Sequence, residues 1–455
     1  MRTKERVADQ GNQITEGVIW KQLLLFFFPI LFGTFFQQLY NAADAMIVGR
    51  FVGKEALSAV GGGTGTVINL LVGFFVGLSG GASIVIAQYY GAKRKEMVDY
   101  AVHTAIAFCL LGGVVMTVLG IFAAPAVLRM MATPADVLDL SVLYIRIYFA
   151  GMIGNLIYNV GSAILRAVGD SKRPLYFLIV SCLTNIALDL LLVVVCRLGV
   201  AGAAIATIVS QALSAVLVIL ALMRTDDMYH LNLHRIGFDK RMLGRIVRLG
   251  FPTGLQSVLY GLSNIVIQTA INGQGTDTVA AWTAYAKQDA MFWMIVNAFG
   301  ISVTTFAGQN FGAGKPERVK KGLWSCLGMC AGTAVLLSVV MCVACPFLYR
   351  VFTTDDAVIR IGIQMTLFIS PTYLTYVCVE VISGALRGIG DCWIPTLICL
   401  AGVCVIRILW ISLAVPAKPD IYTIMFSYPL TWVITSLLFL GYYLLYGRKR
   451  LAAPA

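Results

Sequence analysis

The chain has 455 residues, of which 59% are hydrophobic and only 12% are charged. A soluble domain carries roughly 25% charged residues, so this composition excludes an ordinary water-soluble globular protein and predicts that lipid covers much of the surface. The formal net charge of +12 could indicate a nucleic-acid partner, but its distribution along the chain favours another explanation.

Long apolar stretches predict an all-α membrane protein. A helix that crosses a bilayer needs about 20 mostly apolar residues. The first apolar stretch lacks the small-residue cleavage site of a signal peptide, so we expect it to remain as a span. Twelve segments fit, and we expect spans over residues 23–48, 57–87, 98–126, 141–163, 175–196, 200–223, 248–271, 279–306, 322–348, 361–385, 394–415 and 421–446.

Basic residues gather in alternate loops between these spans. If the N-terminus is cytoplasmic, the inner loops contain most of the 34 Lys and Arg residues, including the runs Lys93–Lys95 and Arg448–Arg450. Positively charged loops tend to stay on the cytoplasmic side of a membrane. We therefore expect a multi-pass protein of the plasma (inner) membrane with both termini in the cytoplasm, and no nucleic-acid partner.

The first span carries two features that bear on function. Pro29 interrupts the hydrogen bonding of the helix and is a candidate hinge. Asp44 lies about 21 residues after the start of the span, which at 1.5 Å per residue places it in the outer half of the bilayer. An acidic residue inside a membrane is costly and by default functional. Gln38 and Asn41 of the same span are candidates for a substrate cleft.

A second acidic residue lies in the fifth span. Asp189 is about 15 residues past Pro174, also in the outer half, and Asn185 shares its helix face. Thr207 in the sixth span lies at a compatible depth. Oxygen ligands suit a hard cation such as Na⁺, and two close carboxylates suit a proton because like charges disfavour ionisation of both. Asp44, Asn185, Asp189 and Thr207 are therefore a candidate cation site, or else a buried cluster that fastens spans 1, 5 and 6 together.

The chain contains an internal duplication with an offset of 221 residues. Residues 162–174 read SAILRAVGDSKRP, and residues 383–395 read SGALRGIGDCWIP. The same offset pairs AQYYGA at 87–92 with GQNFGA at 308–313. We expect two six-helix lobes over residues 1–223 and 248–455, joined by a cytoplasmic linker over 224–247. Because each lobe has an even number of helices, the pseudo-twofold axis that relates them runs along the membrane normal.

The repeated loops favour structural roles. Gly169 and Gly390 can each end a helix in a left-handed cap, and Pro174 and Pro395 can occupy the first turn of the next helix. We interpret these turns as structural or hinge-like rather than as substrate contacts. GAGKP at 312–316 resembles part of a phosphate loop but lacks the full GxxxxGKS/T pattern, so we do not expect nucleotide binding there.

The second half has ionisable residues of its own inside predicted spans. Lys287 and Asp289 lie in the eighth span, Glu380 in the tenth and Arg407 in the eleventh. Lys287 and Asp289 are two positions apart, so they point to different helix faces and need different partners. Lys287, Asp289 and Glu380 could line a substrate cleft, or they could tie the lobe together.

The sequence does not favour an enzyme or a bound cofactor. His103, His230 and His234 lie at or near inner-side edges and form no evident triad or metal set. Cys342 and Cys345 form a lone CxxC, whereas a zinc site needs about four ligands. We expect no catalytic residues and no cofactor.

Several motifs together resemble the multidrug and toxic compound extrusion (MATE) family over essentially the whole chain. They are Pro29 followed by DAMIVG at 44–49, the QYYGAKR and QNFGAGKPER loops, the LRAVGD and LRGIGD pair, and NIALD followed by GAAIAT. The resemblance implies export of organic cations or toxic compounds in exchange for Na⁺ or H⁺. It also implies that Asp44, Asn185, Asp189 and Thr207 form the cation site of the first lobe. Some members have an essential Glu on helix 7, but Phe251–Ile271 contains no acidic residue.

We therefore expect a secondary active transporter that exports organic, cationic or amphipathic small molecules by alternating access and works as a monomer, with H⁺ or Na⁺ as the coupling ion. One alternative is a lipid-linked saccharide flippase of related architecture, which a cleft rich in Arg and Lys would favour. A less favoured alternative is a non-transporting membrane receptor or enzyme, which would have little need of a sixfold-plus-sixfold repeat.

Overall fold

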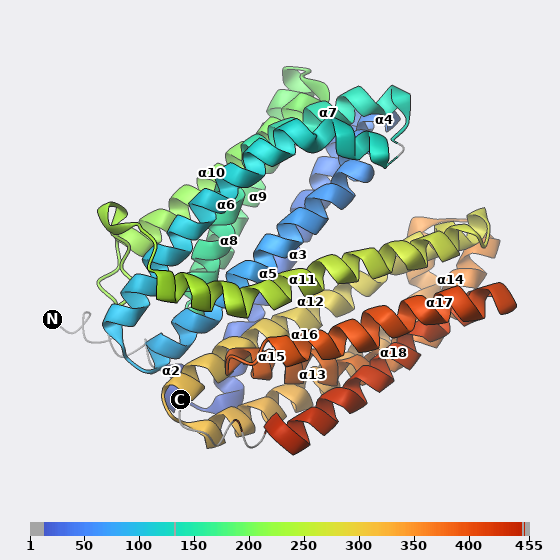
Figure 1. Ribbon diagram of the computed structural model, residues 1–455. Coiled ribbons are helices and arrows are strands. Elements are labelled where there is room, and N and C mark those ends of the chain that lie inside the picture. Colours follow the sequence, from blue (N-terminus) through green and yellow to red (C-terminus); the bar gives the residue numbers. More distant parts are fainter. Residues whose placement is uncertain (1–12, 132, 448–449, 451–455) are drawn as a thin grey trace. The chain divides into compact units, whose positions relative to one another are not determined.

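The computed structural model describes residues 13–131, 133–447 and 450, which form helices joined by short turns (Figure 1). The first half contains α2 (Gln13–Glu16), α3 (Ile19–Phe51), α4 (Lys54–Gly61), α5 (Gly63–Gly91), α6 (Lys95–Met130), α7 (Ala135–Ala150), α8 (Met152–Ala167), α9 (Lys172–Asp189), the π-helix η2 (Leu190–Val195) and α10 (Gly199–Met223). After the 3-10 turn η3 (Leu233–Arg235) come α11 (Lys240–Asn272), α12 (Thr276–Gly312), α13 (Pro316–Phe352), α14 (Asp356–Ile369), η4 (Ser370–Thr372), α15 (Tyr373–Gly388), α16 (Trp393–Cys399), η5 (Leu400–Val405), α17 (Ile406–Ala417), α18 (Ile421–Tyr442) and η6 (Tyr443–Gly447).

These helices confirm an all-α protein of twelve spans. Ten helical segments of the described chain are long and apolar enough to cross a membrane, and the pair α7 and α8 adds an eleventh. Helix α11 is the twelfth span. It is less apolar because Gln256, Asn264 and Gln268 lie among its hydrophobic residues. Each span coincides with one of the predicted segments.

Two spans are broken in a way that their apolar sequence does not predict. Helices α7 and α8 meet at Gly151 with a bend of 50°. A Cβ atom on Gly151 would lie 2.5 Å from the Cβ of Ile208 on α10, so the absent side chain lets α10 approach the bend. Helices α14 and α15 are separated by a 3-10 turn that contains Pro371, whose nitrogen has no hydrogen to donate.

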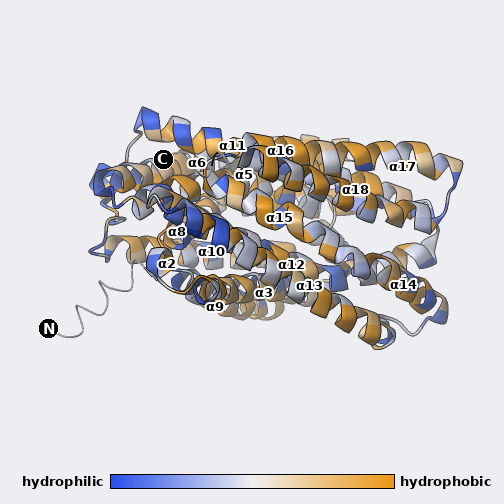
Figure 2. Cartoon of the chain, turned by 90° about the horizontal axis from the view of Figure 1, so that it is seen from below, coloured by the Kyte–Doolittle hydropathy of each residue, from blue (hydrophilic) through white to orange (hydrophobic). Residues whose placement is uncertain are grey.

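The surface of the spans is apolar. Figure 2 shows hydrophobic residues along the middle of the helices and hydrophilic residues near their ends and connections. Soluble monomers rarely expose apolar patches of this extent, so lipid is the natural contact for these side chains. Exposed examples are Phe32, Phe122, Val343, Phe347 and Leu413.

Contacts between residues divide the chain into two units. The N-terminal unit contains residues 28–254, and the C-terminal unit contains residues 255–455 together with the described part of residues 1–27. Helix α3 therefore begins in the C-terminal unit and continues in the N-terminal unit, whereas α11 does the reverse. The predicted limits of the lobes, at 223/224 and 247/248, stay a prediction.

Each unit has its own buried helices. In the N-terminal unit, α6 packs on α7 and α8, while α10 packs on α8 and α9. In the C-terminal unit, α12 packs on α13, α14 and α15, and α15 also packs on α18. Small residues allow these helices to approach closely, as is usual where helices pack in a bilayer.

The turns between helices repeat as the sequence predicts. Gly169 and Gly390, one in each copy of the repeated motif, have φ angles of 101° and 92°, which confirms the left-handed caps. A second pair of turns has Lys93 at φ 54° and Gly314 at φ 68°. The backbone thus adopts the same left-handed conformation at corresponding positions of the two halves, although only one of the second pair is glycine.

Candidate functional site

Three elements of the N-terminal unit position the four predicted cation-site residues. Asp44 lies on α3, Asn185 and Asp189 lie one turn apart at the end of α9, and Thr207 lies on α10. All four side chains are buried, with exposed fractions of 6% for Asp44, 2% for Thr207 and 0% for the two residues of α9. Helix α9 packs on α10, which brings residues of neighbouring spans to one buried region.

The helix geometry changes beside Asp189. It is the last residue of α9, and the chain continues directly as the π-helix η2. Wider turns of this kind occur frequently at functional sites, because they re-aim the side chains next to them. Here the change begins directly after an acidic residue.

The polar atoms of this cluster lack partners. Asp44 Oδ1, both carboxylate oxygens of Asp189, and both side-chain polar atoms of Asn185 are buried without a hydrogen bond. No Lys, Arg or His among the described residues forms an ion pair with either carboxyl group. The two carboxyl groups do interact electrostatically with each other. Buried polar groups are normally satisfied, so these atoms fit a bound cation or proton.

Tyrosine side chains complete the surroundings and were not predicted. Tyr40 lies one turn before Asp44 on α3, next to Thr207, and interacts electrostatically with both carboxyl groups. Tyr144 on α7 interacts with the same two groups. Its ring stacks on that of Tyr148, with centroids 6.3 Å apart. The spacing of Tyr40 from Asp44 was a usable signal, whereas the approach of α7 could not be found from spacing alone.

The predicted substrate-cleft residues have different surroundings. Gln38 and Asn41 are exposed on α3 of the N-terminal unit, where Asn41 Nδ2 donates to Gln38 Oε1 at 3.5 Å. Lys287 is exposed on α12 of the C-terminal unit. Asp289 and Glu380 are largely buried in the same unit, and each is held by neighbouring side chains.

Asp289 accepts hydrogen bonds from three neutral donors. The hydroxyl of Tyr373 lies 2.7 Å from Oδ1, that of Tyr285 lies 3.2 Å from the same oxygen, and Trp293 Nε1 lies 2.6 Å from Oδ2. Arg407 on α17 interacts electrostatically with this carboxyl group. A carboxylate held by three donors is well satisfied, in contrast to Asp189.

Arg407 is itself held by α18. Its guanidinium donates to Thr431 Oγ1 at 3.1 Å and lies 4.5 Å from the centroid of the Tyr428 ring. Glu380 pairs within α15, where Arg387 lies 3.3 Å from its Oε1. Asp289 and Glu380 of the C-terminal unit thus have hydrogen-bonding or ion-pairing partners, whereas Asp44 Oδ1 and both carboxylate oxygens of Asp189 have none among the described residues.

The remaining candidates form no metal centre. The described residues contain no group of three or more His, Cys, Asp or Glu side chains that could hold a metal ion. The cluster around Asp44 has only two carboxyl groups, together with one amide and one hydroxyl, so it is not a group of this kind.

Comparison with known proteins gives the family. The profile of the family described as MatE matches residues 29–191 and 252–411. The chain is 30% identical over 445 residues to the probable multidrug resistance protein YoeA of Bacillus subtilis (strain 168), covering 95% of each chain.

Solved structures agree in fold. The chain is similar to the crystal structure of MATE in the bent conformation, with a TM-score of 0.89, 22% identity and coverage of 97% of both chains. It is equally similar to the structure of MATE in the straight conformation, with a TM-score of 0.89, 22% identity and coverage of 97% and 98%. With twelve spans, a matching family profile over both halves and a relative of this similarity, the chain belongs to the MATE family of membrane transporters.

Proposed function

We propose that this transporter exports organic, cationic or amphipathic compounds in exchange for H⁺ or Na⁺, and that Asp44 and Asp189 bind the coupling ion. The observation that carries the proposal is the buried carboxyl pair without hydrogen bonds, ion pairs or basic neighbours among the described residues. Two buried carboxylates without compensation are unstable in a low-dielectric environment, so they take up a proton or a cation.

Asn185 and Thr207 supply the remaining oxygens. An amide oxygen and a hydroxyl oxygen are ligands that Na⁺ accepts together with carboxylates. With H⁺ as the ion, the amide and hydroxyl would instead hydrogen-bond to the protonated carboxyl group. Both uses fit the donor set, and transport under separate Na⁺ and pH gradients distinguishes them.

The ion can drive transport only if it binds two conformations unequally. Pro29 lies one residue after the start of the N-terminal unit within α3, and it cannot donate a hydrogen bond to the carbonyl one turn earlier. We propose that neutralising Asp44 and Asp189 lets α3 bend at Pro29 and releases the organic compound outside. The similar solved structures are of MATE in a bent and in a straight conformation, so a protein of this fold adopts more than one conformation.

Gln38, Asn41, Lys287, Asp289 and Glu380 stay candidates for contact with the exported compound. Gln38, Asn41 and Lys287 are exposed and therefore accessible. Asp289 would become available only if its three donors released it. The protein is proposed to act as a monomer in the plasma (inner) membrane with cytoplasmic termini, which its basic inner loops favour.

Flux in proteoliposomes tests the coupling directly. Uptake of a fluorescent organic cation would be measured with a Na⁺ gradient alone, with a pH gradient alone, and with neither. We expect one gradient to accelerate uptake and Asp44→Asn to abolish that acceleration. A rate of uptake that neither gradient changes would contradict the proposal. Movement of a lipid-linked saccharide, and not of the dye, would favour the flippase alternative.

Voltage provides a second measurement. One elementary charge that crosses 100 mV gains about 2.3 kcal/mol. A one-for-one exchange of a monovalent compound for one H⁺ or Na⁺ moves no net charge, so an imposed potential should leave its rate unchanged. A strong response to voltage would indicate a different stoichiometry.

A further inference from the structure

Two repeated loop motifs have no part in the proposed ion site. QYYGAKR (88–94) connects α5 to α6, and QNFGAGKPER (309–318) connects α12 to α13. Each contacts a segment that leads into, and includes the first part of, a helix shared between the two units. We name residues 14–27 the α3 lead segment and residues 232–254 the α11 lead segment.

The QNFGAGKPER loop holds the start of the α3 lead segment by its backbone carbonyls. Arg318 donates to the carbonyls of Ile14, at 3.1 Å, and of Gly17. Lys315 Nζ donates to the carbonyl of Thr15 at 3.0 Å. The last carbonyls of a helix have no partner within the helix, and cations suit them. Here the carbonyls at the end of the short helix α2 receive two basic side chains.

The same segment has further contacts with the C-terminal unit. At its start, Asn310 Nδ2 also donates to the carbonyl of Ile14, at 3.3 Å. The ring of Phe27 stacks on that of Phe299 of α12, with centroids 4.1 Å apart. Both ends of the α3 lead segment are therefore fixed to the C-terminal unit.

The QYYGAKR loop holds the α11 lead segment in a corresponding way. Arg245 donates to Gln88 Oε1 at 2.8 Å and to the hydroxyl of Tyr89 at 2.6 Å. Its guanidinium also lies 4.8 Å from the centroid of the Tyr89 ring. Gln88 and Tyr89 are the first two residues of the loop motif, and Gln309 and Asn310 occupy the matching positions of the other copy.

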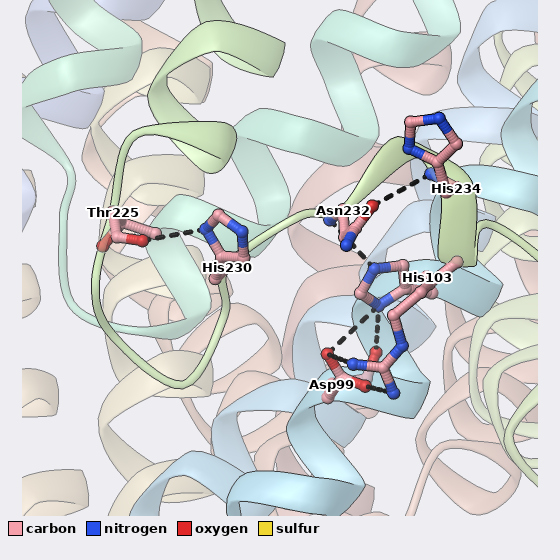
Figure 3. A network of polar contacts seen from close by, with 7 residues as sticks. Asp99, His103, Thr225, His230, Asn232 and His234 are labelled. Atoms are coloured by element: carbon pink, nitrogen blue, oxygen red, sulfur yellow. Dashed lines mark hydrogen bonds and ion pairs between the residues drawn. The ribbon is translucent and has the colours of Figure 1, made fainter.

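The start of the α11 lead segment is pinned to α6 of the N-terminal unit, as Figure 3 shows. His103 Nε2 accepts the backbone N–H of Asn232 at 3.1 Å, while Asp99 pairs with Arg235 at 2.8 Å. His103 Nδ1 lies 2.8 Å from the carbonyl of Asp99. Because Nδ1 faces an acceptor and Nε2 faces a donor, the neutral ring with its proton on Nδ1 fits both contacts.

Deeper in the membrane, glycines join α11 to α5. Gly77 and Gly81 on α5 face Gly250 and Gly254 on α11, and a Cβ on Gly77 would lie 2.6 Å from the Cα of Gly254. Pairs of glycines four residues apart allow helices to approach within backbone contact in a bilayer. This crossing ends where α11 leaves the N-terminal unit, since Gly254 is the last residue of that unit.

Both shared helices change unit beside a proline. In α3 the change falls between Phe27 and Phe28, next to Pro29, and in α11 it falls between Gly254 and Leu255, next to Pro252. Proline inside a helix removes one hydrogen bond and is the commonest cause of a kink. In α3, Pro29 follows the fixed lead segment and gives the helix a defined place to bend. In α11, Pro252 lies within the fixed segment, so a bend is expected only after Gly254.

We propose that the QYYGAKR and QNFGAGKPER loops are crossed anchors, each holding the lead segment of a helix that continues into the other unit. Arg245 and Arg318 are then positioning residues. They keep the lead segments fixed throughout the transport cycle, so that bending of α3 concentrates at Pro29 and bending of α11 falls after Gly254, where its packing on α5 ends. The inference needs only that the protein transports by rearranging its helices, and it holds whichever ion is coupled.

A covalent tether tests whether an anchor stays closed. Glu16 and Glu317 are exposed, and Glu16 interacts electrostatically with Arg318. Both would be replaced by Cys and joined with a flexible bismaleimide, in a Cys196→Ser background because Cys196 is the one exposed cysteine of the described chain. The buried thiols react poorly, and burial raises the pKa of Cys392 to about 12.

We expect the tethered protein to transport a fluorescent organic cation as fast as protein treated with a monofunctional maleimide. Tethering that stops transport would overturn the proposal, because it would show that the anchor has to open. This result does not depend on Asp44, so it is distinct from a failure of the proposed ion site.

Substitution tests whether the anchors are needed. Arg318→Gln and Arg245→Gln should each lower flux by about tenfold, as expected when a step loses a charge-assisted hydrogen bond that it requires. Binding of the organic cation should be unchanged. Arg318→Lys should restore part of the flux, because an ammonium can still reach one carbonyl. Lys321→Gln and Arg241→Gln are controls, since both residues are exposed and outside these contacts.

Unchanged flux in the folded Arg318→Gln and Arg245→Gln variants would contradict the proposal. If a variant does not fold, the cross-linking experiment still tests the proposal, because the cross-link strengthens the anchor without removing either arginine. Loss of flux together with loss of binding would also count against it, since that pattern indicates a damaged fold and not a misplaced hinge.

Discussion

Asn185 and Asp189 lie one turn apart at the end of α9, and their side-chain polar atoms are buried without a hydrogen-bond partner. The neighbouring carboxyl group of Asp44 is not paired with any described basic residue. This arrangement separates the N-terminal cluster from the acidic residues of the C-terminal unit, which are satisfied by Tyr, Trp and Arg side chains.

The first prediction concerns the two unpaired carboxyl groups. Asp44→Asn or Asp189→Asn should lower ion-driven flux by more than about tenfold, because the neutral amide removes the charge through which ion binding distinguishes two conformations. The measurement is dye efflux from proteoliposomes at fixed protein density. Asp139→Asn, which changes an exposed carboxylate on α7 of the same unit, is the matched control. Equal loss in all three variants would rule out a specific role for the cluster.

The second prediction compares stability at two acidic sites. Asp289→Asn should destabilise the protein by about 1–3 kcal/mol, because an amide nitrogen would face a donor that Asp289 now satisfies. Asp189→Asn should leave stability unchanged or raise it, because it removes an uncompensated buried carboxyl group. Thermal unfolding in detergent measures both. The opposite order of melting temperatures would mean that Asp189 is the structural residue.

The third prediction concerns the proline of the first span. Pro29→Ala should restore a helical hydrogen bond, stiffen α3 and slow transport, while the amount of folded protein in the membrane stays the same. Pro429→Ala is a suitable control, because it removes a proline from the interior of α18 without touching α3. Flux at saturating substrate is the informative readout, and an unaltered rate in Pro29→Ala would exclude the hinge.

The fourth prediction concerns the ion pair between Glu380 and Arg387. Glu380→Gln leaves the guanidinium largely buried and unpaired, so we expect a loss of about 3 kcal/mol. The double variant Glu380→Gln, Arg387→Met should lose less than the sum of the two single changes. A double-mutant cycle of thermal unfolding measures this coupling. Strict additivity would show that the two side chains do not stabilise each other.

Much of the fold could be predicted because the bilayer constrains it. A span needs a long apolar run, and all twelve predicted segments are helical. The left-handed caps at Gly169 and Gly390 were also predictable, since glycine followed by Asp at a repeated helix end is a strong local signal. The bend at Gly151 was not, because it depends on the approach of Ile208 from α10 and not on local sequence.

The candidate site was predictable for a different reason. A carboxyl group in an apolar span stands out against its neighbours, which is how Asp44 and Asp189 were found. The aromatic surroundings do not stand out, because Tyr144 and Tyr148 occur in a span already rich in large side chains. The partners of Asp289 escaped prediction as well, since Tyr373 lies 84 positions away in the chain.

The division of the chain into two units was the feature that was hardest to predict from the sequence. Sequence repeats show where a gene segment was copied, but they do not show which bundle a helix end packs against. Residues 14–27 belong by contact to the C-terminal unit although they lie before the first half of the repeat in the sequence. Only contacts such as that between Phe27 and Phe299 show that the start of α3 packs in the C-terminal unit.

Lys93 and Gly314 adopt the same left-handed backbone in corresponding turns. For glycine this conformation has no steric penalty, whereas for lysine it costs about 1 kcal/mol or slightly more. The difference therefore identifies a position at which the stability of the first half could be raised to match the second. Replacing the exposed Lys93 with glycine would remove this conformational cost and stabilise the protein without changing any buried side chain.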